Sequence, residues 1–440
     1  MKRMMYLFPV DRWLVSVLLL AALSANAAEI KYAGVNLAGA EFGHNNLPGT
    51  YNSHYTYPTQ AEVDYFRNKG MNIIRLPFRW ERLQRATNAA LHSTELGRLH
   101  GFVSATTGKG VYVILEPHNF ARYFPDPGNF QTSTQGLVGS YYPNSVFSNF
   151  WWRVADIYKT NDHVIFNLMN EPNSMPTEQW VSAANSAIAG IRAAGSTNVI
   201  HVPGNQWTGA HSWTANYYGT PNSIAMLNIV DPGSNTVFEV HQYLDSDSSG
   251  TTTNIVNANI GVSRIAAFTL WLRANNKRGF LGEFAVANST IGSGATLIGD
   301  EALTNMLSHI QANADVWEGW AWWAAGPWWP GGPGNPGGNP YMFLLDPANL
   351  GQVSQTDKSA MPILRSFIPI PAPALTLTNN NQFRFLTRAG FTYQPESSTN
   401  VTSGWGNYGS AINGSGLTTN VIFPTSGAQN FYRIRVTRNP

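Results

Sequence analysis

Short apolar runs alternate with amphipathic segments along the chain from about residue 30 to residue 368. The apolar runs are rich in branched and aromatic residues, which is typical of buried strands. We expect strands at 32–37, 73–76, 111–115, 164–168, 199–202, 238–241, 279–282 and 319–323. Apolar residues three and four positions apart predict helices between them, most clearly at 59–69, 91–107, 177–193 and 255–275.

Eight strands separated by helices predict an α/β fold, a (β/α)8 TIM barrel, over residues 28–368. A doubly wound open sheet is the main alternative, but the glycine-rich phosphate loop expected after its first strand is missing. The active site of a TIM barrel lies at the C-terminal ends of its strands. Polar residues at those ends are therefore the candidates for chemistry.

The N-terminal segment has the pattern of an export signal. Lys2, Arg3 and Arg12 precede or flank an apolar run at 13–23 that is too short to span a bilayer stably. An Ala-x-Ala pattern follows, which is typical of a cleavage site. We therefore expect residues 1–27 to be a signal peptide and the protein to be secreted, either to the periplasm or outside the cell.

The C-terminal segment differs in composition from the rest of the chain. Residues 369–373 form a proline-rich linker, and residues 374–440 are rich in Thr, Asn, Gly and Ser with alternating apolar positions. This predicts a small all-β module of about seven short strands. The module contains five Arg and one Glu, which gives it a charge of +4.

The composition excludes several kinds of site. The chain has no Cys, so disulfides, thiolate metal sites and cysteine nucleophiles are excluded. The charges of the N-terminal signal account for the whole net charge of +2, and a near-neutral mature chain argues against nucleic acid or an anionic membrane as partner. We expect a soluble monomer. Many of the 15 Trp lie next to Gly and Pro, which favours an exposed groove, and sugar rings offer apolar faces to such side chains.

Two strand ends carry glutamates. Glu171 follows the apolar run 164–168, and Glu283 follows the run 279–282. One protonated and one ionised carboxyl group facing the same cleft are the minimum needed to cleave a glycosidic bond by double displacement. The sequence therefore predicts a polysaccharide hydrolase.

Other strand ends supply polar residues that suit this chemistry. An Arg close to the nucleophile would keep it ionised, a Tyr could hold it by a hydrogen bond, and an Asn could bind the sugar 2-hydroxyl. The residues at these ends are Arg75, His118, Asn170, His241, Tyr243 and Trp323.

Residues 30–368 resemble glycoside hydrolase family 5, and within it the endo-β-1,4-glucanases known as cellulases. The resemblance is carried, in order, by the segments 78–84, 117–123, 164–172 with Asn170-Glu171-Pro172, 203–213, 241–247, 282–284 and 323–329. It implies that Glu171 is the general acid/base and Glu283 the nucleophile of a retaining enzyme that needs no cofactor. It also implies a ring of Arg75, His118, Asn170, His241 and Tyr243 around the cleaved bond, with Trp323 under the sugar and Trp207 in the product-side groove.

The sequence departs from the family pattern at two places that border the cleft. Asn173-Ser174 stand where relatives often have His-Asp, and the Pro/Gly-rich segment after Trp329 is longer than usual. The same mechanism acting on β-mannan or mixed-linkage glucan is therefore an open alternative, because pocket details set sugar discrimination. Alternatives of another class are a non-catalytic polysaccharide-binding protein and an adhesion protein that works through its C-terminal module. The presence of both Glu171 and Glu283 argues against these two for the barrel.

Overall fold

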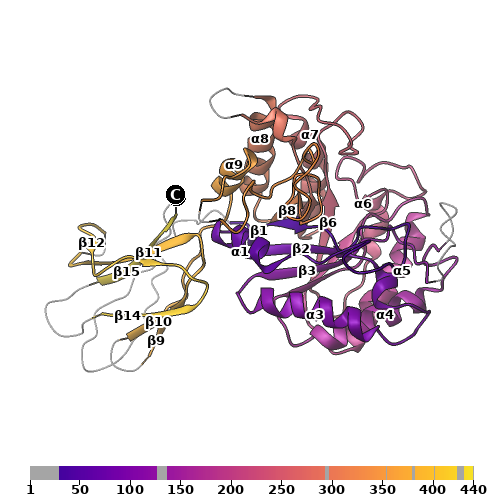
Figure 1. The fold of residues 1–440 in the computed structure, drawn as a ribbon, viewed down its shortest axis with the longest axis horizontal. Helices are drawn as coiled ribbons and strands as arrows, with labels where there is room; N and C mark the ends of the chain where they lie inside the picture. The colour runs from indigo at the N-terminus through magenta and orange to yellow at the C-terminus, as the bar shows by residue number, and fades with distance from the viewer. Residues whose placement is uncertain are drawn as a thin grey trace. The chain divides into compact units, whose positions relative to one another are not determined.

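The computed structural model describes residues 29–125, 136–292, 297–352, 354–378, 382–400, 402–423 and 431–439. The predicted signal peptide, residues 1–27, lies outside the described residues. The chain divides into two compact units, one made mainly of residues 28–367 and one that contains residues 368–440 (Figure 1).

The larger unit is a closed barrel of eight parallel strands that are paired in sequence order, with β8 returning to β1. The strands are β1 (Tyr32–Leu37), β2 (Ile73–Phe78), β3 (Tyr112–Pro117), β4 (Val164–Asn167), β5 (Ile200–Pro203), β6 (Thr236–His241), β7 (Gly279–Glu283) and β8 (Trp317–Ala325). The predicted TIM barrel is confirmed, and each strand lies where the apolar pattern placed it, with end points that differ by two residues at most.

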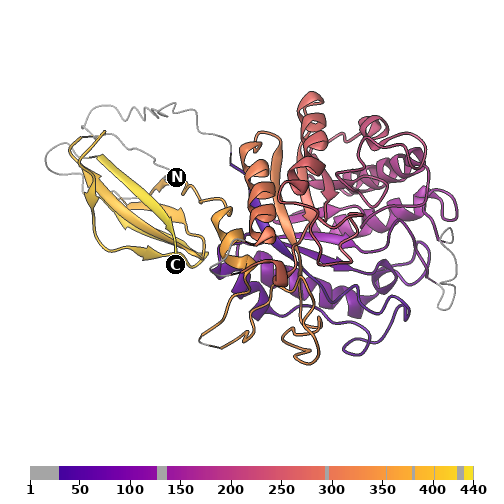
Figure 2. The ribbon, with the colours of Figure 1, turned by 90° about the horizontal axis from the view of Figure 1, so that it is seen from above.

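Helices lie outside the ring of strands, with α4 beside α5 and α7 beside α8 (Figures 1 and 2). They are α1 (Gln60–Asn68), α2 (Trp80–Leu83), α3 (Ser93–Thr107), α4 (Asn144–Tyr158), α5 (Thr177–Ala193), α6 (Asn222–Ala225), α7 (Ile260–Ala274), α8 (Ile298–Ala312) and α9 (Ala360–Ser366). The expected start of one helix at residue 255 is wrong, because α7 begins at Ile260. The Asn257 side chain accepts a hydrogen bond from the Asn259 N–H, a local bond that competes with helix formation. Among the described residues, no helix is long and apolar enough to cross a bilayer.

The barrel core is built in layers because side chains alternate along each strand. Buried apolar residues of six strands form one cluster: Ile73, Ile114, Ile165, Val237, Phe280 and Ala321. Two residues further along four of these strands, the same face carries Arg75, Glu116, Asn167 and Glu239, all fully buried. A layer of apolar side chains therefore lies beneath a layer of mainly charged ones. We call these four residues the charged layer, and it lies close to the C-terminal ends of the strands.

Two interacting buried carboxyl groups lie on α1 and on the segment after β8. Glu62 Oε2 accepts hydrogen bonds from the N–H and the hydroxyl of Thr59, and Asp346 Oδ2 accepts one from the Gly326 N–H. Their other oxygens are buried without a donor among the described residues. Burial raises the pKa of Glu62 to about 7, and burial together with the charge of Glu62 raises the pKa of Asp346 well above its usual range. We therefore expect Glu62 to keep its proton under mildly acidic conditions.

The C-terminal unit consists of short antiparallel strands, seven of them within its described residues. They are β9 (Thr376–Leu377), β10 (Gln382–Leu386), β11 (Phe391–Ser398), β12 (Gly406–Asn407), β13 (Ile412–Asn413), β14 (Thr418–Ile422) and β15 (Phe431–Arg438). One sheet has the order β14-β10-β9, and in the other β11 pairs with β12, β13 and β15. Phe385, Tyr393 and Tyr432 are buried in this unit, so these aromatic rings serve its core.

Candidate active site

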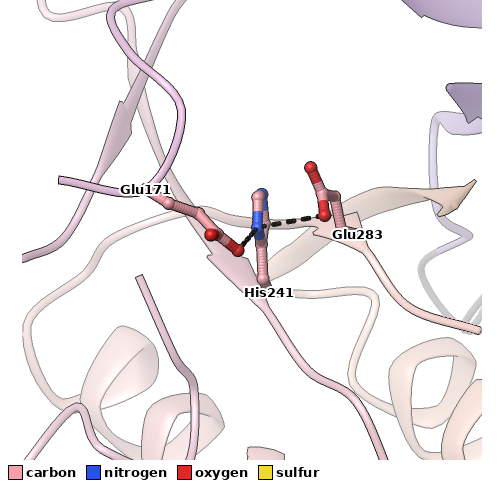
Figure 3. Close-up of side chains that lie close together, drawn as sticks. All are labelled: Glu171, His241 and Glu283. Carbon is pink, nitrogen blue, oxygen red and sulfur yellow. Dashed lines mark hydrogen bonds and ion pairs between the residues drawn. The ribbon is translucent and has the colours of Figure 1, made fainter. Parts of the chain in front are cut away.

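Two carboxyl groups and one imidazole meet at the C-terminal ends of β4, β6 and β7 (Figure 3). His241 Nδ1 lies 2.8 Å from Glu171 Oε1 and 3.6 Å from Glu283 Oε2. The three atoms all lie within 4.8 Å of one another, so the carboxyl groups of Glu171 and Glu283 face each other across a short gap. Glu171 has a positive φ of 42°, a backbone conformation that non-glycine residues adopt mainly where function or packing requires it.

Both oxygens of Glu283 accept a hydrogen bond. Arg75 Nη1 donates to Oε1 at 2.9 Å, and the Tyr243 hydroxyl donates to Oε2 at 2.8 Å. This is the arrangement of an ionised carboxylate, since a protonated group would have to use one oxygen as a donor. An Arg and a Tyr therefore both donate to Glu283 and stabilise its ionised form.

Arg75 lies fully buried at the centre of the charged layer. Besides Glu283 it contacts Glu116 at 3.3 Å and Glu239 at 3.2 Å, and it donates to the side-chain oxygens of Asn36 and Asn170. A fully buried guanidinium requires such partners, because an uncompensated buried charge is very costly. Its position relative to the strand ends is thus set by contacts with four strands, β1, β3, β6 and β7, and with the segment that follows β4.

Burial and neighbouring charges shift the pKa values of the two glutamates in the charged layer. Burial raises the pKa of Glu116 to about 7 against the charge of Arg75. Burial alone would also raise the pKa of Glu239, but Arg75 and hydrogen bonds from His201 and His241 hold it well below its usual range. Glu239 is therefore an ionised partner for the cations around it.

His241 and Glu283 influence each other. Burial lowers the pKa of His241, but the charge of Glu283 and the hydrogen bonds to Glu171 and Glu239 outweigh this and raise it to about 9. Burial raises the pKa of Glu283, and Glu171 adds to the effect, while His241 and Arg75 act in the opposite direction. At neutral pH, His241 is thus a cation that both carboxyl groups of the cleft contact.

A second chain of contacts runs from Glu116 to the aromatic side of the cleft. Glu116 Oε2 lies 3.0 Å from His118 Nδ1, and His118 Nε2 lies 3.2 Å from the Asn170 amide nitrogen. The His118 ring stacks on Trp323 with a centroid distance of 5.5 Å. Burial and the charge of Arg79 lower the pKa of His118 well below its usual range, so it acts as a neutral hydrogen-bonding group.

A cavity of about 560 Å³ opens beside Glu171 and His241. Its wall includes Trp207, which is 48% exposed, and Tyr217, which is 69% exposed. Trp207 belongs to a left-handed turn in which Gln206, Trp207 and Thr208 all have φ values between 48° and 60°. Two hydrogen bonds hold the turn at the C-terminal end of the barrel strands: the Trp207 N–H donates to the Pro172 carbonyl, and the His241 N–H donates to the Thr208 carbonyl.

The structure brings the nine residues named from the sequence to one end of the barrel. Trp207 lines the cavity beside Glu171, whereas Trp323 stacks on His118. The sequence patterns do not single out Asn36, Glu116, Glu239 or Tyr341 as residues of the site. A signal existed for two of them, because Glu116 and Glu239 precede His118 and His241 by two residues and therefore share their strand face. Asn36 and Tyr341 lacked such a signal.

The atoms of Glu171, His241 and Glu283 are also close enough to be considered as metal ligands, and they are the one such group of three among the described residues. The guanidinium of Arg75 already lies against Glu283, and His241 is a cation at neutral pH. A further cation would meet repulsion from both, so the charge pattern favours proton transfer over metal binding.

The comparison with protein families decides between the possible classes of hydrolase. A family model described as cellulase, glycosyl hydrolase family 5, matches residues 28–326. The chain belongs to this family.

Relatives of this family 5 chain are similar over most of the barrel. Endoglucanase gh5-1 of Neurospora crassa is 42% identical over 302 residues, which cover 68% of the chain and 71% of the relative. Endoglucanase 3 of Humicola insolens is 38% identical over 300 residues, with the same two shares.

Solved structures show the same similarity. The endo-β-1,4-glucanase Xac0029 from Xanthomonas axonopodis pv. citri is 41% identical with a TM-score of 0.69, covering 77% of this family 5 chain and 98% of its own. XacCel5A, solved in complex with cellopentaose, is 41% identical with a TM-score of 0.68, covering 77% and 99%.

Proposed function

We propose that the chain is a retaining endo-β-1,4-glucanase that hydrolyses internal bonds of cellulose and related β-glucans. The observation that supports retention of configuration at the anomeric carbon is the short separation of the two carboxyl groups. Retaining glycosidases hold them about 5–5.5 Å apart, whereas inverting enzymes leave roughly 6.5–9.5 Å for a water molecule. Oxygens of Glu171 and Glu283 lie within 4.8 Å, which supports double displacement.

In the first step, Glu283 attacks the anomeric carbon while Glu171 donates its proton to the departing glycosidic oxygen. The bond from carbon to that oxygen breaks, and an ester bond from the sugar to Glu283 forms. In the second step, Glu171 takes a proton from water, the water oxygen attacks the anomeric carbon, and Glu283 leaves as a carboxylate. The two inversions restore the β configuration.

The surrounding residues support these steps through the contacts that they make. Arg75 and Tyr243 donate to the two oxygens of Glu283 and so favour its ionised, attacking form. His241 contacts both carboxyl groups and keeps them in place. Asn170 is held by Arg75 and His118, an orientation from which its amide could bind the sugar 2-hydroxyl. Trp323 and Trp207 would then stack on sugar rings on the two sides of the cleaved bond.

The comparison with relatives supports β-1,4-glucan as the substrate, because the names of two relatives describe endoglucanases and one related structure is a complex with cellopentaose. Product analysis on carboxymethylcellulose, mixed-linkage β-glucan and β-mannan would test this choice. We expect cello-oligosaccharides to form fastest from β-1,4-linked glucan. A higher rate on mannan would assign the chain to the same mechanism on another sugar.

We further propose that the protein is secreted, acts as a monomer and uses neither a cofactor nor a membrane. The charged start, apolar run and Ala-x-Ala pattern of residues 1–27 support export. N-terminal sequencing of the protein recovered outside the cytoplasm should begin close to residue 28. An uncleaved N-terminus would contradict this part of the proposal.

The roles of the two glutamates are tested by trapping the covalent intermediate. A 2-deoxy-2-fluoro β-cellobioside with a good leaving group slows the second step more than the first, so the ester accumulates. Peptide mass mapping should find the sugar on Glu283, and NMR of the first hydrolysis products should show the β anomer. A label on Glu171, or initial α product, would remove the proposed assignment.

A further inference from the structure

The Pro/Gly-rich segment after Trp329 folds back on itself and returns to the cleft at Tyr341. The Gly331 N–H donates to the Asn335 carbonyl, the Gly334 N–H donates to the Pro327 carbonyl, and the Tyr341 N–H donates to the Pro330 carbonyl. These bonds close the segment into a compact excursion whose two ends lie together. The excursion therefore delivers one aromatic side chain, Tyr341, to a defined position.

Tyr341 contacts two tryptophans on the wall of the cleft that carries the sugar platform. Its ring stacks on Trp329 with a centroid distance of 3.9 Å and an interplanar angle of 11°. Its hydroxyl oxygen accepts a hydrogen bond from the Trp323 indole N–H at 3.1 Å. The ring contact holds Tyr341, and the hydroxyl contact fixes the edge of the Trp323 indole.

The residues that follow Tyr341 are anchored to the barrel. The Phe343 carbonyl accepts a hydrogen bond from the indole N–H of Trp322, and the Leu345 N–H donates to the Ala324 carbonyl. Both partners belong to β8, the strand that also carries Trp323. Tyr341 is thus supported by the same strand whose terminal aromatic residue it contacts.

Tyr341 also lies in the electrostatic surroundings of the two groups at the cleaved bond. Burial raises its pKa and the charge of Glu283 adds to this, while Tyr341 in turn helps to raise the pKa of Tyr243. The Phe343 ring lies between them, 5.6 Å from the Tyr341 ring and 6.0 Å from the Tyr243 ring. The hydroxyl of Tyr341 therefore stays protonated and is available as a neutral acceptor.

We propose that Tyr341 is a positioning residue that orients Trp323 beneath the sugar at the cleaved bond. The excursion at 330–340 would then serve to present this hydroxyl rather than to bind substrate itself. This inference rests on the proposed glucanase function, in which Trp323 is the platform. A platform that tilts would present the anomeric carbon to Glu283 at a poorer angle, and small displacements at this point are costly to the rate.

The test is a double-mutant cycle between Tyr341→Phe and Trp323→Phe, measured with an aryl β-cellobioside and with carboxymethylcellulose. Tyr341→Phe keeps the ring that stacks on Trp329 and removes only the acceptor. A single hydrogen bond of this kind predicts a decrease in kcat of about three- to tenfold, with KM changed less than about twofold. Trp323→Phe removes the donor, so adding Tyr341→Phe to it should cost less than about twofold more.

Tyr158→Phe is the matched control, because Tyr158 is buried on α4 and its hydroxyl has no partner among the described residues. It should leave kcat unchanged. The melting temperature of each variant separates positioning from folding, since Tyr341→Phe should lower kcat without a matching loss of stability.

If Tyr341→Phe lowers kcat by the same factor in the wild-type and Trp323→Phe backgrounds, the inference is overturned, because the hydroxyl would then act without Trp323. An unchanged kcat in Tyr341→Phe would overturn it as well. Neither result would affect the glucanase proposal, provided that the wild-type enzyme still hydrolyses the substrates and is trapped on Glu283. Absence of trapping in the wild type would instead indicate failure of the proposed function.

Discussion

Replacing Glu62 by Gln should flatten the dependence of barrel stability on pH. The pKa of this buried carboxyl group is about 7 in the folded protein, against an ordinary value of 4.5. Between these pH values the folded state holds a proton that the unfolded state has lost, so stability falls as pH rises. The contribution is fully present below about pH 4.5 and is lost as the pH passes about 7.

The size of the effect follows from the number of protons. One extra proton bound by the folded state corresponds to about 1.4 kcal/mol of unfolding free energy per pH unit, or roughly 3 kcal/mol over the whole interval. Gln can mimic the protonated carboxyl group, because its carbonyl can accept the Thr59 hydrogen bonds and its side chain carries no charge at any of these pH values. Glu62→Gln should therefore match the wild type near pH 4.5 and exceed its stability above pH 7.

Thermal unfolding followed by circular dichroism at pH 5, 6 and 7 would measure the difference. For a domain of this size, the slopes of melting temperature against pH should differ by roughly 2 °C per pH unit between the wild type and Glu62→Gln. Asp156→Asn serves as control, since Asp156 is an exposed carboxylate paired with Lys159. Parallel slopes for the wild type and Glu62→Gln would refute the reasoning.

Three further predictions concern activity, and a fourth concerns binding by the C-terminal module. Glu283→Gln should leave almost no activity on any substrate, whereas Glu171→Gln should spare substrates with excellent leaving groups and form a β-glycosyl azide when azide is added; exchanged phenotypes would reverse the assignment. Activity should fall in acid as Glu283 becomes protonated, with a midpoint above the ordinary Glu value because burial raises its pKa. Tyr243→Phe removes a donor to the ionised form and should move that midpoint higher still in a pH profile of kcat/KM; a lower midpoint would contradict the role of the hydroxyl. Truncation within residues 369–373 should leave the rate on soluble β-glucan nearly unchanged, because the barrel has its own core. The separate module should bind microcrystalline cellulose weakly, since Tyr393 and Tyr432 are buried, and its depletion by cellulose at moderate salt would show otherwise.

The barrel was predictable because each strand appears as a short apolar run between helical patterns. Glu171, Glu283 and the polar strand ends were predictable for a related reason, since the C-terminal ends of barrel strands converge. The charged layer was harder to recognise. Glu116 and Glu239 lie inside strands, where a single Glu is more often a scaffold residue, and only the alternation of side chains links them to the cleft.

The pattern of apolar and polar residues does not predict the conformation of the loops. The residue types of Gln206, Trp207 and Thr208 do not predict three consecutive left-handed conformations. Hydrogen bonds of this turn to Pro172 and to His241 of β6 hold the backbone in that conformation. The return of Tyr341 to Trp323 likewise depends on how the glycine-rich excursion closes. The start of α7 at Ile260 shows the same limit at a helix end, where local side-chain bonds compete with helical ones.

The contact of His241 with both carboxyl groups has a consequence for the movement of charge during the reaction. Under the proposed roles, negative charge disappears from Glu283 when its oxygen bonds to the sugar and appears on Glu171 when its proton departs. The carboxyl oxygens that lose and gain this charge, on Glu283 and Glu171, lie within 4.8 Å of each other. Both carboxyl groups also contact the same nitrogen of His241, Nδ1. The net charge of the cleft is therefore the same before the step and in the intermediate, and the solvent outside needs little reorientation. The chemical step should accordingly respond weakly to ionic strength, in contrast to a reaction that creates or removes charge in its cleft.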